Sequence, residues 1–170
     1  MTRSSLVLFL LAALPAHAAS DDAPDLAAFD RFARAAGPYC AQAAATACFE
    51  RSFRFADRDG DGELSLAELE LLRRATREWT SANREQLAPG DRRGILATLA
   101  VIELAGLPRL FRSYDTDASG GLSRAELLAD VRLDDRPLAE LVRDRDAVDW
   151  PSLGRRLGPA AALVDGLLGR

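Results

Sequence analysis

The chain has 170 residues, of which 48% are hydrophobic and 28% are charged, the composition of one globular domain rather than of a disordered or membrane-embedded protein. Its net charge is −4 and its arginines are mixed with acidic residues along the chain, which argues against a nucleic-acid-binding protein. All of its basic residues are arginine, a bias that with abundant alanine, leucine and glycine indicates a GC-rich genome and an origin of bacterial type.

The N-terminal end has the pattern of a secretory signal peptide over residues 1–18. Arg3 supplies a positive charge, the apolar run Leu6–Leu14 follows, and Pro15 precedes the small residues that end at Ala18. The alternative, an uncleaved membrane anchor, needs about 20 apolar residues, and this run is shorter. We therefore predict cleavage after Ala18, export to the periplasm or the medium, and no stable membrane anchor in the mature protein.

The predicted cleavage removes His17, the only histidine of the chain, and so removes the commonest general base and transition-metal ligand. The remaining sequence has no recognisable nucleophile–base pair, phosphate-binding glycine loop or open metal site, so we predict that the protein is not an enzyme. Glu103 lies in an apolar stretch, and we expect it to pair with an arginine at the core boundary. Trp79 and Trp150 are expected to cover core edges.

Hydrophobic periodicity predicts an all-α fold. A first helix begins near Pro24 and is expected to end at Gly37–Pro38, within an N-terminal helix and linker that span residues 19–45. Residues 46–133 contain a repeated helical unit with an inserted helix near 92–105, and C-terminal helices follow over 134–170. The later predicted helices are Thr46–Ala56, Leu64–Trp79, Arg92–Ala105, Pro108–Tyr114, Leu122–Leu133, one that is capped by Asp135 and opened by Pro137, and a weak apolar helix in 159–170.

Two twelve-residue acidic loops repeat at an offset of 58 residues, DRDGDGELSLAE over Asp57–Glu68 and DTDASGGLSRAE over Asp115–Glu126. Alternate side chains on a tightly curled loop converge on one point, and converging oxygen ligands suit a hard cation such as calcium, at about 2.3–2.6 Å. Gly62 and Gly120, each sixth in its loop, allow the sharp turn. The last glutamate can offer both of its carboxylate oxygens. The pattern therefore predicts two calcium-binding loops, each between two helices.

Both segments resemble EF-hand loops, and the helices around them fit the helix–loop–helix unit of that family over residues 46–80 and 107–133. The resemblance implies that Leu64 and Leu122, each eighth in its loop, pack across a short two-stranded bridge when the loops pair. The implied calcium ligands are Asp57, Asp59, Asp61, the backbone carbonyl of Glu63 and Glu68 in the first loop, and Asp115, Asp117, Ser119, the backbone carbonyl of Gly121 and Glu126 in the second, with Ser65 and Ser123 acting through water.

The first loop offers four ligating carboxylates and the second offers three, because Ser119 is neutral, so we predict that the first site binds calcium more tightly. Two features argue against a promiscuous calcium sensor. The inserted helix is expected to fill the groove that a target would use, and the mature chain has no methionine, the residue that lets sensor surfaces repack. We therefore predict a calcium buffer or sensor, or a calcium-stabilised binding protein with an unidentified protein partner. The alternative is a calcium-dependent docking module of the dockerin type.

Cys40 and Cys48 are the only cysteines, and in an exported chain a disulfide between them is the first expectation. On one continuous helix their Cα atoms would lie about 12 Å apart, whereas a disulfide needs less than about 7 Å. A bridge therefore requires residues 40–46 to leave the helix, which a break at Gly37–Pro38 would permit. We favour the disulfide, with two free buried thiols as the alternative.

Overall fold

The computed structural model describes residues 25–141 and 144–167, so the predicted signal peptide lies outside the described residues. Within them the chain is mainly helical, with one short two-stranded sheet, which confirms the predicted all-α class. The elements are α1 (Leu26–Cys40), α2 (Ala45–Ala56), β1 (Leu64–Ser65), α3 (Leu66–Ala82), α4 (Pro89–Ala105), α5 (Leu107–Tyr114), β2 (Gly121–Leu122), α6 (Arg124–Leu127), α7 (Leu138–Leu141), α8 (Trp150–Leu157) and α9 (Ala161–Leu167), with 3₁₀ turns η1 (Arg145–Ala147) and η2 (Gly158–Ala160).

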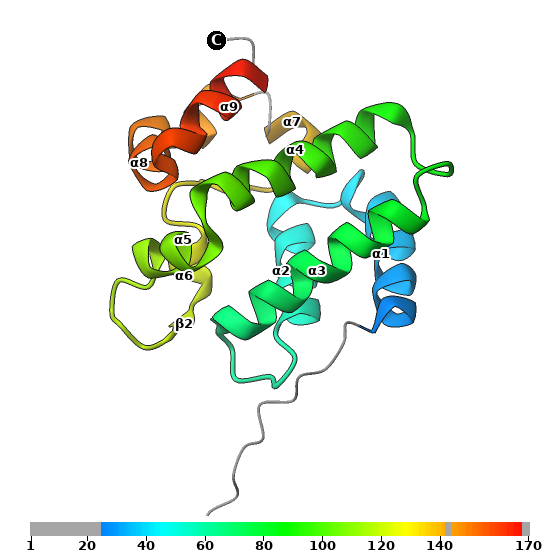
Figure 1. The fold of residues 1–170 in the computed structure, drawn as a ribbon, viewed down its shortest axis with the longest axis horizontal. Coiled ribbons are helices and arrows are strands. Elements are labelled where there is room, and N and C mark those ends of the chain that lie inside the picture. The colour runs from blue at the N-terminus through cyan, green and yellow to red at the C-terminus, as the bar shows by residue number, and fades with distance from the viewer. Residues whose placement is uncertain (1–24, 142–143, 168–170) are drawn as a thin grey trace, which may run out of the picture.

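The inserted helix α4 joins the two halves of the fold (Figure 1). It contacts α3, α5, η2 and α9. It begins at Pro89, slightly earlier than predicted, because a proline at the start of a helix loses no intrahelical hydrogen bond. Near its end, Glu103 forms an ion pair with Arg77 of α3, which confirms the predicted arginine partner. Ala105, the last residue of α4, is buried in a cluster with Leu157 and Ala160.

Among the described residues, no single helix is long and apolar enough to cross a membrane. The pair α4 and α5 together passes that test of length and composition, but the two helices are bent by 80° where they meet.

The first helix, α1, runs through Gly37 and Pro38 to Cys40, so its predicted end is wrong. A proline this close to the end of a helix removes only one backbone donor, and the last turn is closed by the Ala41 N–H, which donates to the Gly37 carbonyl at 3.1 Å. Cys40 forms a disulfide with Cys48 of α2, and their Cα atoms lie 5.1 Å apart. The favoured disulfide is therefore confirmed, and the chain leaves the helix after Cys40 rather than before it.

Aromatic side chains pack α1 against α2 and α3. The ring of Phe29, a buried residue, meets Phe55 edge to face at a centroid distance of 6.0 Å and lies 5.9 Å from the ring of Trp79. Trp79 is half-buried at the edge of this core, as predicted, and its indole N–H donates to Asp30 at 2.8 Å. Because α2 and α3 flank the first acidic loop, this core fixes both ends of that loop.

The helix after the second acidic loop, α6, ends at Leu127, so the predicted extension to Leu133 is wrong. The chain instead pairs with the segment before α8, where the Asp149 N–H donates to the Asp130 carbonyl at 2.8 Å. The Asp130 side chain is buried and accepts a hydrogen bond from the Tyr114 hydroxyl at 2.7 Å. These contacts come from residues far along the chain, so the local helical pattern does not reveal them.

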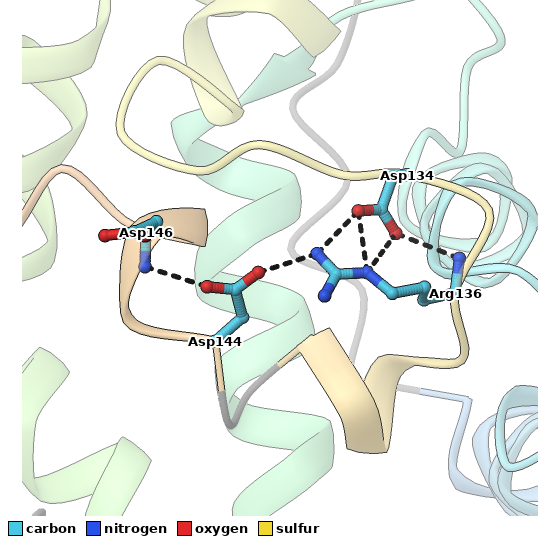
Figure 2. Close-up of polar contacts among 4 residues, drawn as sticks. All are labelled: Asp134, Arg136, Asp144 and Asp146. Atoms are coloured by element: carbon cyan, nitrogen blue, oxygen red, sulfur yellow. Dashed lines mark hydrogen bonds and ion pairs between the residues drawn. The ribbon is translucent and has the colours of Figure 1, made fainter.

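Four charged residues organise the connection between α6 and α8 (Figure 2). The Arg136 guanidinium donates to Asp134 at 2.7 Å and to Asp144 at 2.8 Å, and Asp144 also accepts the Asp146 N–H at 3.0 Å. Asp134 forms the turn by accepting the Arg136 N–H at 2.9 Å. Helix α7 begins beyond this turn, so Asp135 does not cap it as predicted.

The helix α8 has no counterpart among the predicted elements. Its start has a recognisable signal, because Asp149 accepts the Ser152 N–H at 3.0 Å and Pro151 lies in the first turn. The predicted helix at the end of the chain is present as α9. It packs back onto the fold, with Val164 against the buried cluster that includes Ala105 of α4.

Candidate metal centre

The first acidic loop connects α2 to α3 and gathers three carboxylates. Oxygen atoms of Asp57, Asp59 and Glu68 all lie within 4.8 Å of one another. Asp57 follows the last residue of α2, and Glu68 lies in the first turn of α3, where it forms a capping box with Ser65. The loop therefore holds its first and last acidic residues on helix ends, which limits their movement.

Backbone N–H groups orient these carboxylates. The Gly60 and Gly62 N–H groups donate to the two oxygens of Asp57, at 2.8 and 3.1 Å. The Arg58 N–H donates to Glu68 at 2.6 Å, which closes the loop end to end. Gly62 has φ of 91°, a backbone conformation that glycine adopts without steric strain, as its position at the predicted turn requires.

The second acidic loop, between α5 and α6, repeats this geometry. Oxygen atoms of Asp115, Asp117 and Glu126 lie within 4.8 Å of one another. The Thr116 N–H donates to Glu126 at 2.7 Å, and the Gly120 N–H donates to Asp115 at 3.3 Å. Each of these bonds has its equivalent in the first loop, where the Arg58 N–H donates to Glu68 and the Gly62 N–H donates to Asp57.

Glu126 is held in its ionised form. It is buried, and the backbone N–H groups of Ser123 and Thr116 donate to its two oxygens, at 3.0 and 2.7 Å. These hydrogen bonds lower the pKa of the Glu126 carboxyl to about 2, because they stabilise the charged form. The carboxylate therefore carries its full charge at neutral pH.

The atoms of the second loop fit a hard divalent cation. Asp115 Oδ1 is buried and has no hydrogen-bond partner among the described residues. A buried anionic oxygen without a partner is destabilising, and a cation would compensate its charge. The side chains at this point offer only oxygen atoms, the donor type that calcium prefers.

The remaining predicted ligands lie outside the two three-carboxylate groups. Asp61 is exposed, and its carboxylate accepts the Glu63 N–H at 2.8 Å. The Ser119 hydroxyl oxygen lies 3.1 Å from the Gly121 carbonyl oxygen, so two predicted ligands of the second loop contact each other. The side chain of Glu63, whose backbone carbonyl is a predicted ligand of the first loop, instead reaches the second loop, where it accepts from Ser119 at 3.2 Å.

The two loops lie side by side through the antiparallel strands β1 and β2. Leu64 is paired with Leu122, and both side chains are buried, which confirms the predicted bridge. Arg124, at the start of α6, crosses to the first hand and donates to the Gly62 carbonyl at 3.2 Å and to Glu50 at 3.1 Å. No sequence pattern revealed the crossing contacts of Glu63 and Arg124, because each partner lies more than fifty residues away along the chain.

Residues 49–72 match a family model described as EF hand. The first acidic loop therefore lies in a segment that is similar to an EF hand. The matched range contains most of the incoming helix α2, the whole loop and the first part of the outgoing helix α3. EF hands bind divalent cations, usually calcium, through carboxylates that converge as those of Asp57, Asp59 and Glu68 do. Comparisons with curated proteins and with solved structures gave no match.

Proposed function

We propose that this protein binds two calcium ions, one in each acidic loop, and that calcium stabilises its fold outside the cytoplasm. The observation that carries the proposal is the equivalence of the loops, since each gathers three carboxylates and is closed by the same backbone hydrogen bond to its last glutamate. The EF-hand match supports the first site, and the second rests on this equivalence and on the buried, unpartnered oxygen of Asp115.

The residues that would hold each ion are those of the predicted ligand sets. A bound calcium ion would supply positive charge that offsets the repulsion among the carboxylates of each loop. The chain itself holds the carboxylate oxygens of each loop close together before the ion binds. Helix ends anchor the first and last acidic residues, and β1 and β2 fix one loop against the other.

Binding that is specific to the folded state stabilises it by mass action, by about 2.7 kcal/mol when free calcium is 100 times the dissociation constant. The experiment compares thermal unfolding in calcium and in chelator, for the wild type and for a Glu68→Gln, Glu126→Gln double variant. We expect calcium to raise the unfolding temperature of the wild type and to leave the double variant unchanged. Identical wild-type curves in the two buffers would refute the proposed function.

A buffering or stabilising role fits the surroundings of the hands better than a target-opening sensor role. The apolar faces of α3 and α4 form a groove of about 400 Å³, lined by residues such as Leu69 and Leu72 of α3 and Ile95 and Leu99 of α4. The inserted helix α4 lines this groove without filling it, and its apolar face opposite α3 supports the proposed buffering or stabilising role. Apolar dye binding that stays constant when calcium is added would support this role.

The proposed location is the periplasm or the medium, and the protein is proposed to have no catalytic activity. The signal-peptide pattern of residues 1–18 supports export, and so does the disulfide between Cys40 and Cys48, because disulfides persist in oxidising compartments. N-terminal sequencing of the protein from its native host tests export, and a mature chain that begins at Ala19 is the expected result.

A calcium-dependent docking module is the second candidate, and two exposed leucines favour it. Leu96 and Leu104 of α4 are 50% and 54% exposed, and their spacing of eight residues places them on one side of the helix. The complete incoming helices α2 and α5 differ from the shorter repeats of the dockerin type. A Leu96→Ser, Leu104→Ser variant that loses calcium-dependent capture of a defined partner would support this candidate.

A further inference from the structure

We propose that Glu63 of the first loop belongs functionally to the second metal site, where its carboxylate supplies the negative charge that Ser119 lacks. This inference rests on the proposed binding of calcium by both loops. The Ser119 hydroxyl donates to Glu63 Oε2 at 3.2 Å and lies 3.1 Å from the Gly121 carbonyl. Glu63 thus contacts a predicted ligand of the second loop and acts as its positioning residue.

Gly121 of the second loop leaves room for the Glu63 side chain to reach Ser119. A Cβ atom added to Gly121 would lie 2.8 Å from the Cβ of Glu63, a distance that real side chains do not tolerate. Gly121 does not have a positive φ, so backbone conformation does not require glycine at this position. The close approach of Glu63 is the physical reason for a glycine here.

The crossing also reduces the difference in charge between the two sites. The first loop has four ligating carboxylates, from Asp57, Asp59, Asp61 and Glu68, whereas the second has those of Asp115, Asp117 and Glu126. Adding Glu63 gives the second site its fourth negative charge. The first loop therefore supplies, across the paired strands, the fourth carboxylate that the second loop lacks in its own sequence.

Arg124 makes a contact in the opposite direction, from the second hand to the first loop. Arg124 of the second hand donates to the Gly62 carbonyl of the first loop at 3.2 Å and stacks over the ring of Phe53 in α2 at 3.8 Å. The second hand thus places a cation beside the first loop, while the first hand places an anion beside the second loop.

The test is a calcium titration of the full mature chain followed by NMR, using the amides of Gly62 and Gly120 as one probe in each loop. These N–H groups donate to Asp57 and Asp115, so each reports on its own site. We expect Glu63→Gln to weaken the second site about tenfold, the size of effect typical when the partner of a metal ligand is removed. The first site is expected to change by less than about twofold, because the Glu63 backbone is retained.

Two further variants sharpen this test. Glu70→Gln makes the same change of charge outside the loops, on a side chain that pairs with Arg73 at 2.8 Å, and is expected to leave both sites unchanged. Ser119→Asp restores a carboxylate within the second loop, so Glu63→Gln should weaken the second site less in that background than in the wild type.

The outcomes separate this inference from the proposed function. A wild-type chain in which neither glycine amide responds to calcium would refute calcium binding itself. Wild-type binding at both sites, combined with a Glu63→Gln variant that binds like Glu70→Gln or loses affinity equally at both sites, would overturn only the role of Glu63. A loss confined to the second site and relieved by Ser119→Asp supports it.

Discussion

The hydroxyl of Tyr114 donates a 2.7 Å hydrogen bond to the buried carboxylate of Asp130. Tyr114 directly precedes Asp115, the first residue of the second acidic loop. Arg156 of α8 completes the arrangement, with its Nε 3.0 Å from the Asp130 carboxylate and its guanidinium 4.3 Å from the centre of the tyrosine ring. Burial and the adjacent Asp130 raise the pKa of Tyr114, so the hydroxyl keeps its proton at neutral pH. The C-terminal helices are therefore attached to the incoming helix of the second hand.

Tyr114→Phe is expected to lower the free energy of unfolding by about 1–3 kcal/mol, because it leaves a buried carboxylate with one partner fewer. Chemical denaturation in calcium-free buffer measures the change. Tyr39→Phe is the matched control, since Tyr39 is 39% exposed and its ring contact with Arg51 does not need the hydroxyl. Equal stability of the Tyr114 and Tyr39 variants would show that the buried bond contributes little.

Reduction of the disulfide between Cys40 and Cys48 is expected to lower stability by roughly 2–3 kcal/mol, the loop-closure term for a short ring. The bridge joins the end of α1 to the first turn of α2, so its loss frees the entry to the first hand. Denaturation of the oxidised and reduced protein gives the difference, and a Cys40→Ser, Cys48→Ser variant should match the reduced form. Oxidised and reduced proteins of equal stability would contradict this prediction.

Acidification tests the charge cluster of Figure 2. Hydrogen bonds from Arg136 hold the pKa of Asp134 and of Asp144 below the ordinary value of 3.8. A lowered pKa contributes stability that is present above pH 3.8 and is lost as the pH falls through the folded-state values. Arg136→Gln should therefore be less stable than the wild type at pH 7, and the difference should disappear in strong acid.

Measurement of this pH dependence needs calcium-free buffer, so that titration of the metal loops does not dominate. The side chains of Asp134, Arg136 and Asp144 are 30–45% exposed to solvent, which keeps the expected effect small. A difference between wild type and Arg136→Gln that is the same at pH 7 and pH 2 would show that the two proteins differ through packing rather than through charge.

The metal loops were predictable from sequence because their chemistry is local. Twelve consecutive residues contain the carboxylates, the turn glycine and the capping glutamate, and the structure gathers Asp57, Asp59 and Glu68 as the pattern requires. The bridge between Leu64 and Leu122 followed from the resemblance to a known family. The disulfide could be favoured because the chain has only two cysteines.

The features that sequence reasoning missed depend on partners far along the chain. The helix after the second loop stops early because Asp130 turns toward Tyr114 and the segment at Asp149, rather than because a local breaker is present. Likewise, nothing in the spacing of Glu63 indicates that its carboxylate reaches Ser119. The start of α8 was the exception, since the Asp149 cap and the following proline were a readable local signal.

Single substitutions at the twelfth position of each loop test which of the two sites binds calcium more tightly. Glu68→Gln is expected to remove the first site and Glu126→Gln the second, because each deletes the only charge at the twelfth position of its loop. The first loop has four carboxylates among its own ligands, whereas Glu63 reaches the second site only through Ser119, so Glu68→Gln should remove the tighter phase of a calcium titration. Equal losses of affinity from the two variants would contradict this order.

The most direct measurement of the central claim is the calcium stoichiometry of the mature chain, by isothermal titration calorimetry of disulfide-bonded protein freed of metal. Two calcium ions per chain are expected for the wild type, one for each single variant at Glu68 or Glu126, and none when both are changed. A wild-type stoichiometry of one would contradict the assignment of the second loop, and no binding would contradict the account of both.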